Sequence, residues 1–224
     1  MKPVAMIAGV GPGLGAGLVS AFANAGYETV GLSRRGNAHG AHHSCKVDLI
    51  NPDAVTSAIG GITESIGPVD VYVHNAALLH NGTLTETKPE DFERAWRVAV
   101  LGAVNGVQAV LPTMLQRGSG SILVSGATAS IRGGANFAAF ASAKFALRGF
   151  TQSLAREVQP KGVHAAHVIL DGLMRGTPSV NQFDGSDNRS IDPLEAGEAF
   201  VWLAKQRQSA WTFELDLRPQ TEKF

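Results

Sequence analysis

The chain has 224 residues, 44% of them hydrophobic and 17% charged, and its 19 basic side chains balance its 19 acidic ones. This composition excludes a disordered chain and a polyanion-binding surface, so we expect no nucleic-acid partner. The length fits one domain over residues 1–224. The single cysteine, Cys45, cannot form a disulfide within the chain, which favours a reducing, cytoplasmic compartment.

Short apolar segments alternate with helical ones in the first half of the chain. In order, the patterns predict a strand at residues 4–8, a helix at 13–25, strands at 28–32 and 46–48, a helix at 52–64 and a strand at 69–73. The first strand is apolar throughout, as expected in a parallel sheet covered on both faces. Gly26 can end the first helix, and Asn51 can cap the second.

The alternation continues in the second half. It predicts a helix from residue 88 past Trp96, a helix at 100–115, a strand at 121–124, a helix at 138–158, a strand at 163–170, a surface loop at 182–190, a helix at 192–206 and a strand at 211–217. Polar residues and a proline interrupt the uncharged run 98–116, and glycines interrupt the run 3–27, so neither predicts a membrane span. The pattern predicts an α/β protein, a single-domain Rossmann fold with a doubly wound parallel sheet of about seven strands.

A glycine-rich turn joins the first predicted strand to the first predicted helix. It contains Gly9, Gly11, Pro12, Gly13, Leu14 and Gly15. Glycines let a phosphate approach the backbone closely, and the start of the helix offers N–H groups and the positive end of its dipole. The turn is therefore predicted to bind the pyrophosphate of a dinucleotide.

The spacing of Gly9, Gly13 and Gly15 resembles that of the short-chain dehydrogenase/reductase family. Further family marks follow in the same order along nearly the whole chain: Asp48 with its neighbour Leu49, then Asn75, Ala76 and Ala77, then Lys144, and finally Asp171 and Gly172 where the family usually has Pro-Gly. The resemblance implies a nicotinamide cofactor bound by these residues, with Asp48 near the adenine and Lys144 on the nicotinamide ribose.

Charge at the end of the second strand bears on the choice of cofactor. Ser33, Arg34 and Arg35 stand where an acidic residue would accept hydrogen bonds from a free ribose 2′-hydroxyl. Serine and arginine instead suit a 2′-phosphate, so we expect NADP rather than NAD. The alternative is that Arg34 and Arg35 are solvated turn residues.

The resemblance also implies four catalytic positions, normally a serine, a tyrosine, a lysine and an asparagine. In this chain they hold Ala127, Phe140, Lys144 and Ala99, respectively. In the family the lysine lowers the pKa of the tyrosine, so that the phenol can exchange a proton with the substrate oxygen. Phenylalanine has no proton to give, so the usual mechanism is not expected here.

Other side chains could serve in place of the missing ones. The only tyrosines, Tyr27 and Tyr72, are predicted after the first helix and within a buried strand, so neither replaces the absent tyrosine. Four other side chains lie near the predicted site: Ser125, Thr128, His80 and Arg132. Histidine titrates near neutral pH, and arginine could either bind an anionic substrate or cover a surface loop.

Two functions remain open. The first is an NADP-dependent oxidoreductase for a carbonyl or alcohol of unknown identity, in which Lys144, a water or His80 moves the proton. The second is a non-catalytic NADP(H)-binding sensor or partner protein, because three catalytic functions are absent together. Apolar faces at 100–115 and 138–158 resemble the family's dimer surface and imply a homodimer or homotetramer, and no side-chain cluster predicts a metal site.

Overall fold

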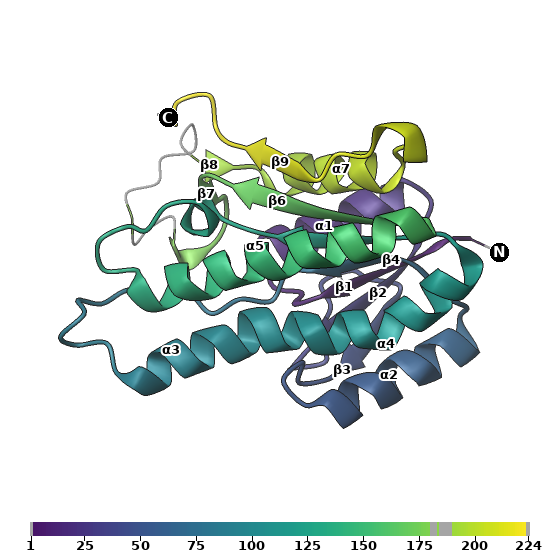
Figure 1. Ribbon diagram of the computed structural model, residues 1–224, viewed down its shortest axis with the longest axis horizontal. Helices are drawn as coiled ribbons and strands as arrows, with labels where there is room; N and C mark the ends of the chain where they lie inside the picture. The colour runs from purple at the N-terminus through teal and green to yellow at the C-terminus, as the bar shows by residue number, and fades with distance from the viewer. Residues whose placement is uncertain (1, 180–182, 184–189, 223–224) are drawn as a thin grey trace.

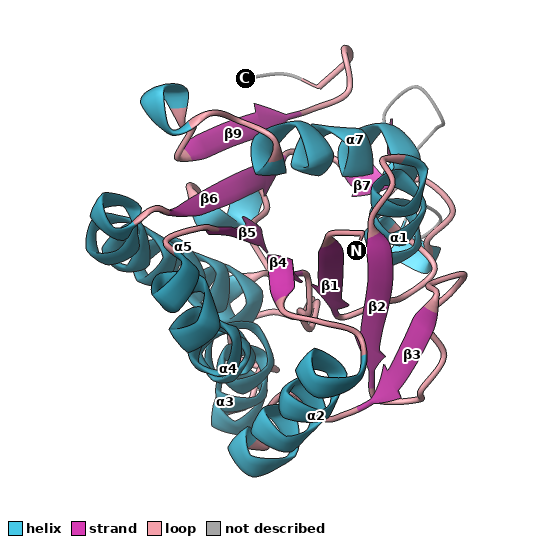
Figure 2. Ribbon diagram, turned by 90° about the vertical axis from the view of Figure 1, so that its right-hand side faces the viewer, coloured by secondary structure: helices cyan, strands magenta, loops and turns pink. Residues whose placement is uncertain are grey.

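Seven parallel strands form the central sheet of the computed structural model, which describes residues 2–179, 183 and 190–222. Their order across the sheet is β3 (His43–Lys46), β2 (Glu28–Ser33), β1 (Val4–Ala8), β4 (Val69–His74), β5 (Gly120–Ser125), β6 (Val163–Leu170) and β9 (Glu214–Leu217). The chain winds from β1 to one edge, returns to β4 beside β1 and continues to the other edge (Figure 2). The predicted doubly wound Rossmann fold is confirmed.

Helices cover both faces of the sheet (Figure 2). One face carries α1 (Leu14–Asn24) and α7 (Pro193–Ala204), and the other carries α2 (Pro52–Ser65), α4 (Gly102–Arg117) and α5 (Ala138–Val158), with α3 (Pro89–Trp96) packed against α5. Short 3-10 turns are η2 (Thr128–Ser130), η3 (Gln159–Lys161) and η5 (Gln208–Ala210). Glycine lets α1 and α7 approach closely, since a Cβ at Gly17 would lie 2.0 Å from Pro193 O.

Two predicted helix ends are found in the structure. The Asn51 side chain accepts a hydrogen bond from Ala54 N at 3.1 Å at the start of α2, where Pro52 occupies the first position. After α1, Gly26 adopts φ +91°, a conformation that glycine tolerates and other residues rarely adopt.

One long helical rod replaces the two helices predicted between residues 88 and 115 (Figure 1). The π-helical turn η1 (Arg97–Leu101) joins α3 to α4, so the chain does not break between them. The rod Pro89–Arg117 is long and apolar enough to cross a membrane, but half of its most apolar window is buried inside the domain. Such burial is expected for a core helix of this fold.

Two strands are shifted from their predicted positions, and two short strands were not predicted. The third strand is His43–Lys46 rather than 46–48. It lies at the edge of the sheet and its side chains are polar and mostly exposed, whereas the apolar Val47, which is buried in the core, follows the strand. The last strand begins at Glu214 rather than 211, since Trp211 stacks on His164 instead of pairing in the sheet. The two-residue strands β7 (Leu173–Met174) and β8 (Ser190–Ile191) were too short to predict, and the predicted loop 182–190 lies outside the described residues except for 183 and 190.

Candidate functional site

The turn between β1 and α1 is held tightly against its neighbours. Gly9 has φ +95°, its N–H donates to Leu32 O at 3.0 Å, and a Cβ there would lie 2.6 Å from Ala76 N. Gly11, by contrast, has open space on its side-chain face. Helix α1 follows Gly13 without a side-chain cap, an arrangement that leaves backbone N–H groups for a bound phosphate.

A cavity of about 910 Å³ opens along the carboxyl ends of the strands. It spans the point where the strand order reverses between β1 and β4, the usual ligand position in such sheets. Ser33 and Arg34, which end or follow β2, line one part, and Phe140 and Lys144 of α5 line another. The cavity therefore joins the adenine side of the predicted cofactor site to the predicted catalytic positions.

Most residues predicted to bind the cofactor line this cavity: Gly9, Gly11, Gly13, Leu14, Gly15, Ser33, Arg34, Asp48, Leu49, Asn75, Ala76, Ala77, Lys144, Asp171 and Gly172. Pro12 and Arg35 are exposed and lie outside the described lining. The two neighbouring arginines are thus distinguished by position, because only Arg34 faces the cavity.

The predicted catalytic positions come together in part. Phe140, Ala127 and Lys144 line the cavity, and Lys144 Nζ lies 5.8 Å from the centre of the Phe140 ring. Ala99 does not line it, because it is buried inside the π-helical turn, and its neighbour Val98 faces the cavity instead. π-helical turns interrupt the regular helical hydrogen bonds and are frequent at functional sites. In this chain the turn is present although alanine stands at the predicted asparagine position, Ala99.

A chain of hydrogen bonds connects Lys144 to the glycine turn. Lys144 Nζ donates to Ser125 O at 2.8 Å, Ser125 Oγ donates to Asn75 Oδ1 at 2.9 Å, and Asn75 Nδ2 donates to Gly9 O at 2.9 Å. The Ser125 hydroxyl is therefore engaged within the protein. Burial lowers the pKa of Lys144 to about 8, because the apolar surroundings disfavour its charged form.

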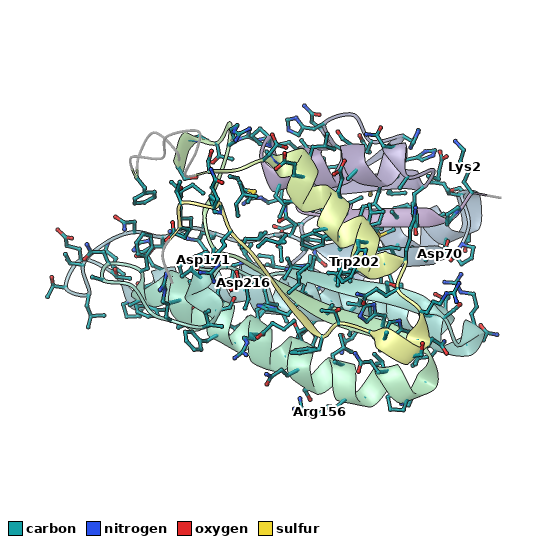
Figure 3. All side chains as sticks on the ribbon, turned by 90° about the horizontal axis from the view of Figure 1, so that it is seen from above. Lys2, Asp70, Arg156, Asp171, Trp202 and Asp216 are labelled. Atoms are coloured by element: carbon teal, nitrogen blue, oxygen red, sulfur yellow. The ribbon has the colours of Figure 1, made fainter. Side chains whose placement is uncertain are left out.

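Asp171 anchors a second polar network at the same end of the molecule as Asp216 (Figure 3). The Thr128 hydroxyl donates to Asp171 Oδ1, while Arg218 lies 3.3 Å and Arg132 lies 3.7 Å from the Asp171 carboxylate. Arg218 also donates to Asp216 at 3.0 Å. The end of β9 is thereby tied to the cavity, a link that no sequence motif indicated.

The histidines near the site do not line the cavity. His74 on β4 and His167 on β6 are fully buried on either side of Val124, and no hydrogen-bond partner is found for their ring nitrogens among the described residues. Burial lowers the pKa of His74 to about 3 and that of His167 to about 4. His80 lies 3.2 Å from the Thr87 hydroxyl and outside the lining, so it is poorly placed to exchange a proton with a ligand.

Several cavity residues escaped the sequence analysis. Phe137 and Phe183 line it with their ring centres 5.6 Å apart, and Thr177 closes over the glycine turn, since a Cβ at Gly13 would lie 2.5 Å from its methyl group. Phe137 precedes Phe140 by almost one helical turn, a spacing that could have revealed it. Glu222 also lines the cavity, and nothing in the local sequence indicates it.

Comparison with known proteins decides the family. The family model described as short chain dehydrogenase matches residues 3–184. This chain belongs to that family. A solved short-chain dehydrogenase from Rhodopseudomonas palustris is 32% identical with a TM-score of 0.82, covering 98% of this chain and 99% of that one.

Two other dehydrogenases resemble it along most of their length. The 3-alpha-(or 20-beta)-hydroxysteroid dehydrogenase of Mycobacterium tuberculosis is 28% identical over 219 residues, covering 92% of this chain and 84% of that protein. An alcohol dehydrogenase from the archaeon Thermococcus sibiricus, solved with 5-hydroxy-NADP, is 24% identical with a TM-score of 0.86, covering 100% and 99% of the two chains.

This short-chain dehydrogenase has no tyrosine at its cavity among the described residues. Tyr27 and Tyr72 are both buried and outside the lining, and Tyr72 packs against Gly106 on the face covered by α4. The glycine turn and Lys144 are present together with an aromatic ring at the position of the usual proton donor. The cavity thus contains the glycine turn and the lysine of the predicted site but no phenol among the described residues.

Proposed function

We propose that this short-chain dehydrogenase binds NADP(H) and interconverts a carbonyl compound and its alcohol, with Lys144 as the proton-transferring group. One observation carries the proposal: a single cavity runs past the glycine turn and is lined by both Arg34 and Lys144. Its volume of about 910 Å³ lies near the upper end of ordinary ligand sites, which suits a dinucleotide and a small ligand together.

The residues at the end of β2 support NADP over NAD. Arg34 faces the cavity, and its guanidinium can form two parallel hydrogen bonds to a phosphate. The Ser33 hydroxyl lies beside it, although it now donates to Asn37 O at 3.0 Å. The related alcohol dehydrogenase with bound 5-hydroxy-NADP is consistent with this choice.

The chemistry follows from what remains on the cavity wall. When bound, NADPH supplies a hydride to the carbonyl carbon, and the carbonyl oxygen must then gain a proton. Phe140 and Ala127 have no proton to donate, whereas Lys144 with a pKa of about 8 is mostly protonated at pH 7. Loss of a positioned general acid typically costs about 10²–10⁴ in rate, so we expect slow turnover.

A non-catalytic NADP(H)-binding protein is the second candidate. This candidate is favoured by Phe140, Ala127 and Ala99, because these apolar side chains stand at the three positions where the family has a tyrosine, a serine and an asparagine. This candidate shares the cofactor site with the first and differs in having no turnover at all.

Titration with NADPH and NADH tests the shared cofactor site. Arg34→Ala should weaken NADPH binding by about 10- to 100-fold and leave NADH binding nearly unchanged, because a charge-assisted hydrogen bond contributes about 1.5–3 kcal/mol. Arg35→Ala is the matched control, since this neighbouring arginine lies outside the cavity. Absence of NADPH binding would eliminate both candidates.

Turnover then separates the two candidates. NADPH oxidation is followed with a panel of carbonyl compounds, in the unaltered protein and in Lys144→Met. Slow turnover that Lys144→Met abolishes supports the oxidoreductase, and NADPH binding without any turnover supports the non-catalytic protein. Turnover that Lys144→Met leaves unchanged would refute the role of Lys144.

We also propose a cytoplasmic homo-oligomer. Trp96 on α3 and Phe145 on α5 are 44% and 45% exposed, and such large apolar side chains on neighbouring helices suit contact with a second copy. A monomeric mass by light scattering would refute this assembly.

A further inference from the structure

Arg132 brings a guanidinium to the part of the cavity around Asp171. It follows the turn η2 and lines the cavity together with Gly133 and Gly134. Its side chain is 52% exposed, and 3.7 Å separate its Nη2 from Asp171 Oδ1. That distance exceeds a hydrogen bond, so the N–H groups of Arg132 remain able to bind a ligand.

The acidic groups near Arg132 are engaged by another arginine. Asp171 lies 3.3 Å from Arg218 Nη2 and also accepts a hydroxyl hydrogen bond, and Arg218 in turn donates to Asp216. Glu222 lines the cavity as well and interacts electrostatically with Arg218. Asp171 is thus shared by two arginines, and its ion pair with Arg132 is the longer one, so the exposed N–H groups of Arg132 can still bind an anionic group.

Aromatic rings line the same cavity. The centres of Phe137 and Phe183 are 5.6 Å apart, and Phe140 and Val98 add apolar surface from α5 and the π-helical turn. Ala127 adds a methyl group where the family normally has a hydroxyl. Phe137 and Phe183 pack against each other, and with Phe140 they give the cavity an aromatic wall on which a flat apolar ligand can pack edge-to-face or with an offset.

We propose that the ligand is an aromatic oxo or hydroxy acid. Its ring packs among Phe137, Phe140 and Phe183, and its carboxylate binds Arg132 in a bidentate pair. The inference rests on the proposed function, since it places this ligand beside NADP(H). Arg132 then selects for the negative charge and the three phenylalanines select for the ring.

Calorimetric titration of probes into the protein saturated with NADP+, which has no hydride to give to a ketone, tests this assignment by the dissociation constant of each probe. Benzoylformate has a ring and a carboxylate, acetophenone has the ring alone, and pyruvate has the carboxylate alone. We expect benzoylformate to bind about tenfold or more tightly than either of the others. Arg132→Gln should remove its advantage over acetophenone, and Arg132→Lys should keep part of it.

Two further variants complete the test. Phe183→Ala should weaken both aromatic probes and leave the ratio of their affinities unchanged. Arg156→Gln, which removes an exposed arginine near the C-terminal end of α5 (Figure 3), is the matched control and should alter neither affinity.

Two outcomes overturn the assignment. Equal affinity for benzoylformate and acetophenone in the unaltered protein would identify a neutral aromatic ligand. If Arg132→Gln left the ratio of the affinities for benzoylformate and acetophenone unchanged, Arg132 would be a solvated loop residue that does not bind the carboxylate. Failure to bind NADPH is seen in the first titration, before any probe is added. That result overturns the proposed function and this assignment together, so the two failures are distinguishable.

Discussion

Replacing Phe140 by tyrosine, together with Ala127→Ser, should add a phenol to the cavity as a second general acid beside Lys144. The lysine is already in place, with its Nζ 5.8 Å from the centre of the Phe140 ring. If the phenolic oxygen lies at a similar distance and the effective dielectric constant is about 20, lysine and phenolate attract each other by about 2.9 kcal/mol. This attraction lowers the phenol pKa by about 2, from about 10 to about 8, so the phenol becomes a proton donor near neutral pH.

The assay follows NADPH absorbance with a carbonyl panel between pH 6 and 10. The double variant should show a kcat/KM about 10²–10⁴ above that of the unaltered protein, and the rate of carbonyl reduction should fall above pH 8 as the phenol loses its proton. Phe145→Tyr is the matched control, because Phe145 is an exposed ring on the same helix. A double variant that folds and binds NADPH but shows no increase would refute the reasoning, because Lys144 would then not activate a donor at residue 140.

The remaining predictions concern stability. The free energy of unfolding should fall by about 4 kcal/mol between pH 7 and pH 5. Burial keeps His74 and His167 neutral in the folded protein, whereas the unfolded chain protonates both below pH 6.5. A free energy of urea unfolding that does not change with pH would contradict this. Gly17→Ala should lower the stability measured by thermal unfolding by more than about 2 kcal/mol, because the new Cβ would lie 2.0 Å from Pro193 O. Gly149→Ala, where a Cβ meets open space, should raise the stability by up to about 1 kcal/mol. Lys144→Met should stabilise the cofactor-free protein at pH 7 by about 1–3 kcal/mol, because it removes a buried ammonium whose pKa is lowered to about 8. A loss of stability measured by calorimetry would contradict this.

The sequence predicted the fold where one physical cause dominated each segment. Strand β1 is apolar on both faces because helices cover both, and α2 starts where Asn51 and Pro52 place a cap. The edge strand β3 was misplaced because its side chains are polar and mostly exposed, so apolar runs do not mark it. The break predicted within the helical rod was wrong because a π-helical turn changes the spacing of the residues without ending the helix.

The sequence predicted cavity-lining residues that follow a strand and missed those that distant segments bring to the cavity. Arg34 and Arg35 are equivalent in sequence, and only the direction of the chain after β2 separates them. Val98 lines the cavity in place of Ala99, because both residues lie in the π-helical turn and Ala99 is directed into the core. Glu222 reaches the cavity through the path of the chain after β9, which no local pattern encodes.

The packing of the last described residues has a practical consequence. A Cβ at Gly172 would lie 2.8 Å from Pro219, so the chain after β9 lies directly on the segment that follows Asp171. Because Glu222 also lines the cavity, a bulky label attached at that residue would compete with ligands. Lys2 lies at the opposite end of the molecule from Asp171 (Figure 3), which makes its amine the safer point of attachment for surface immobilisation or fluorescent labelling.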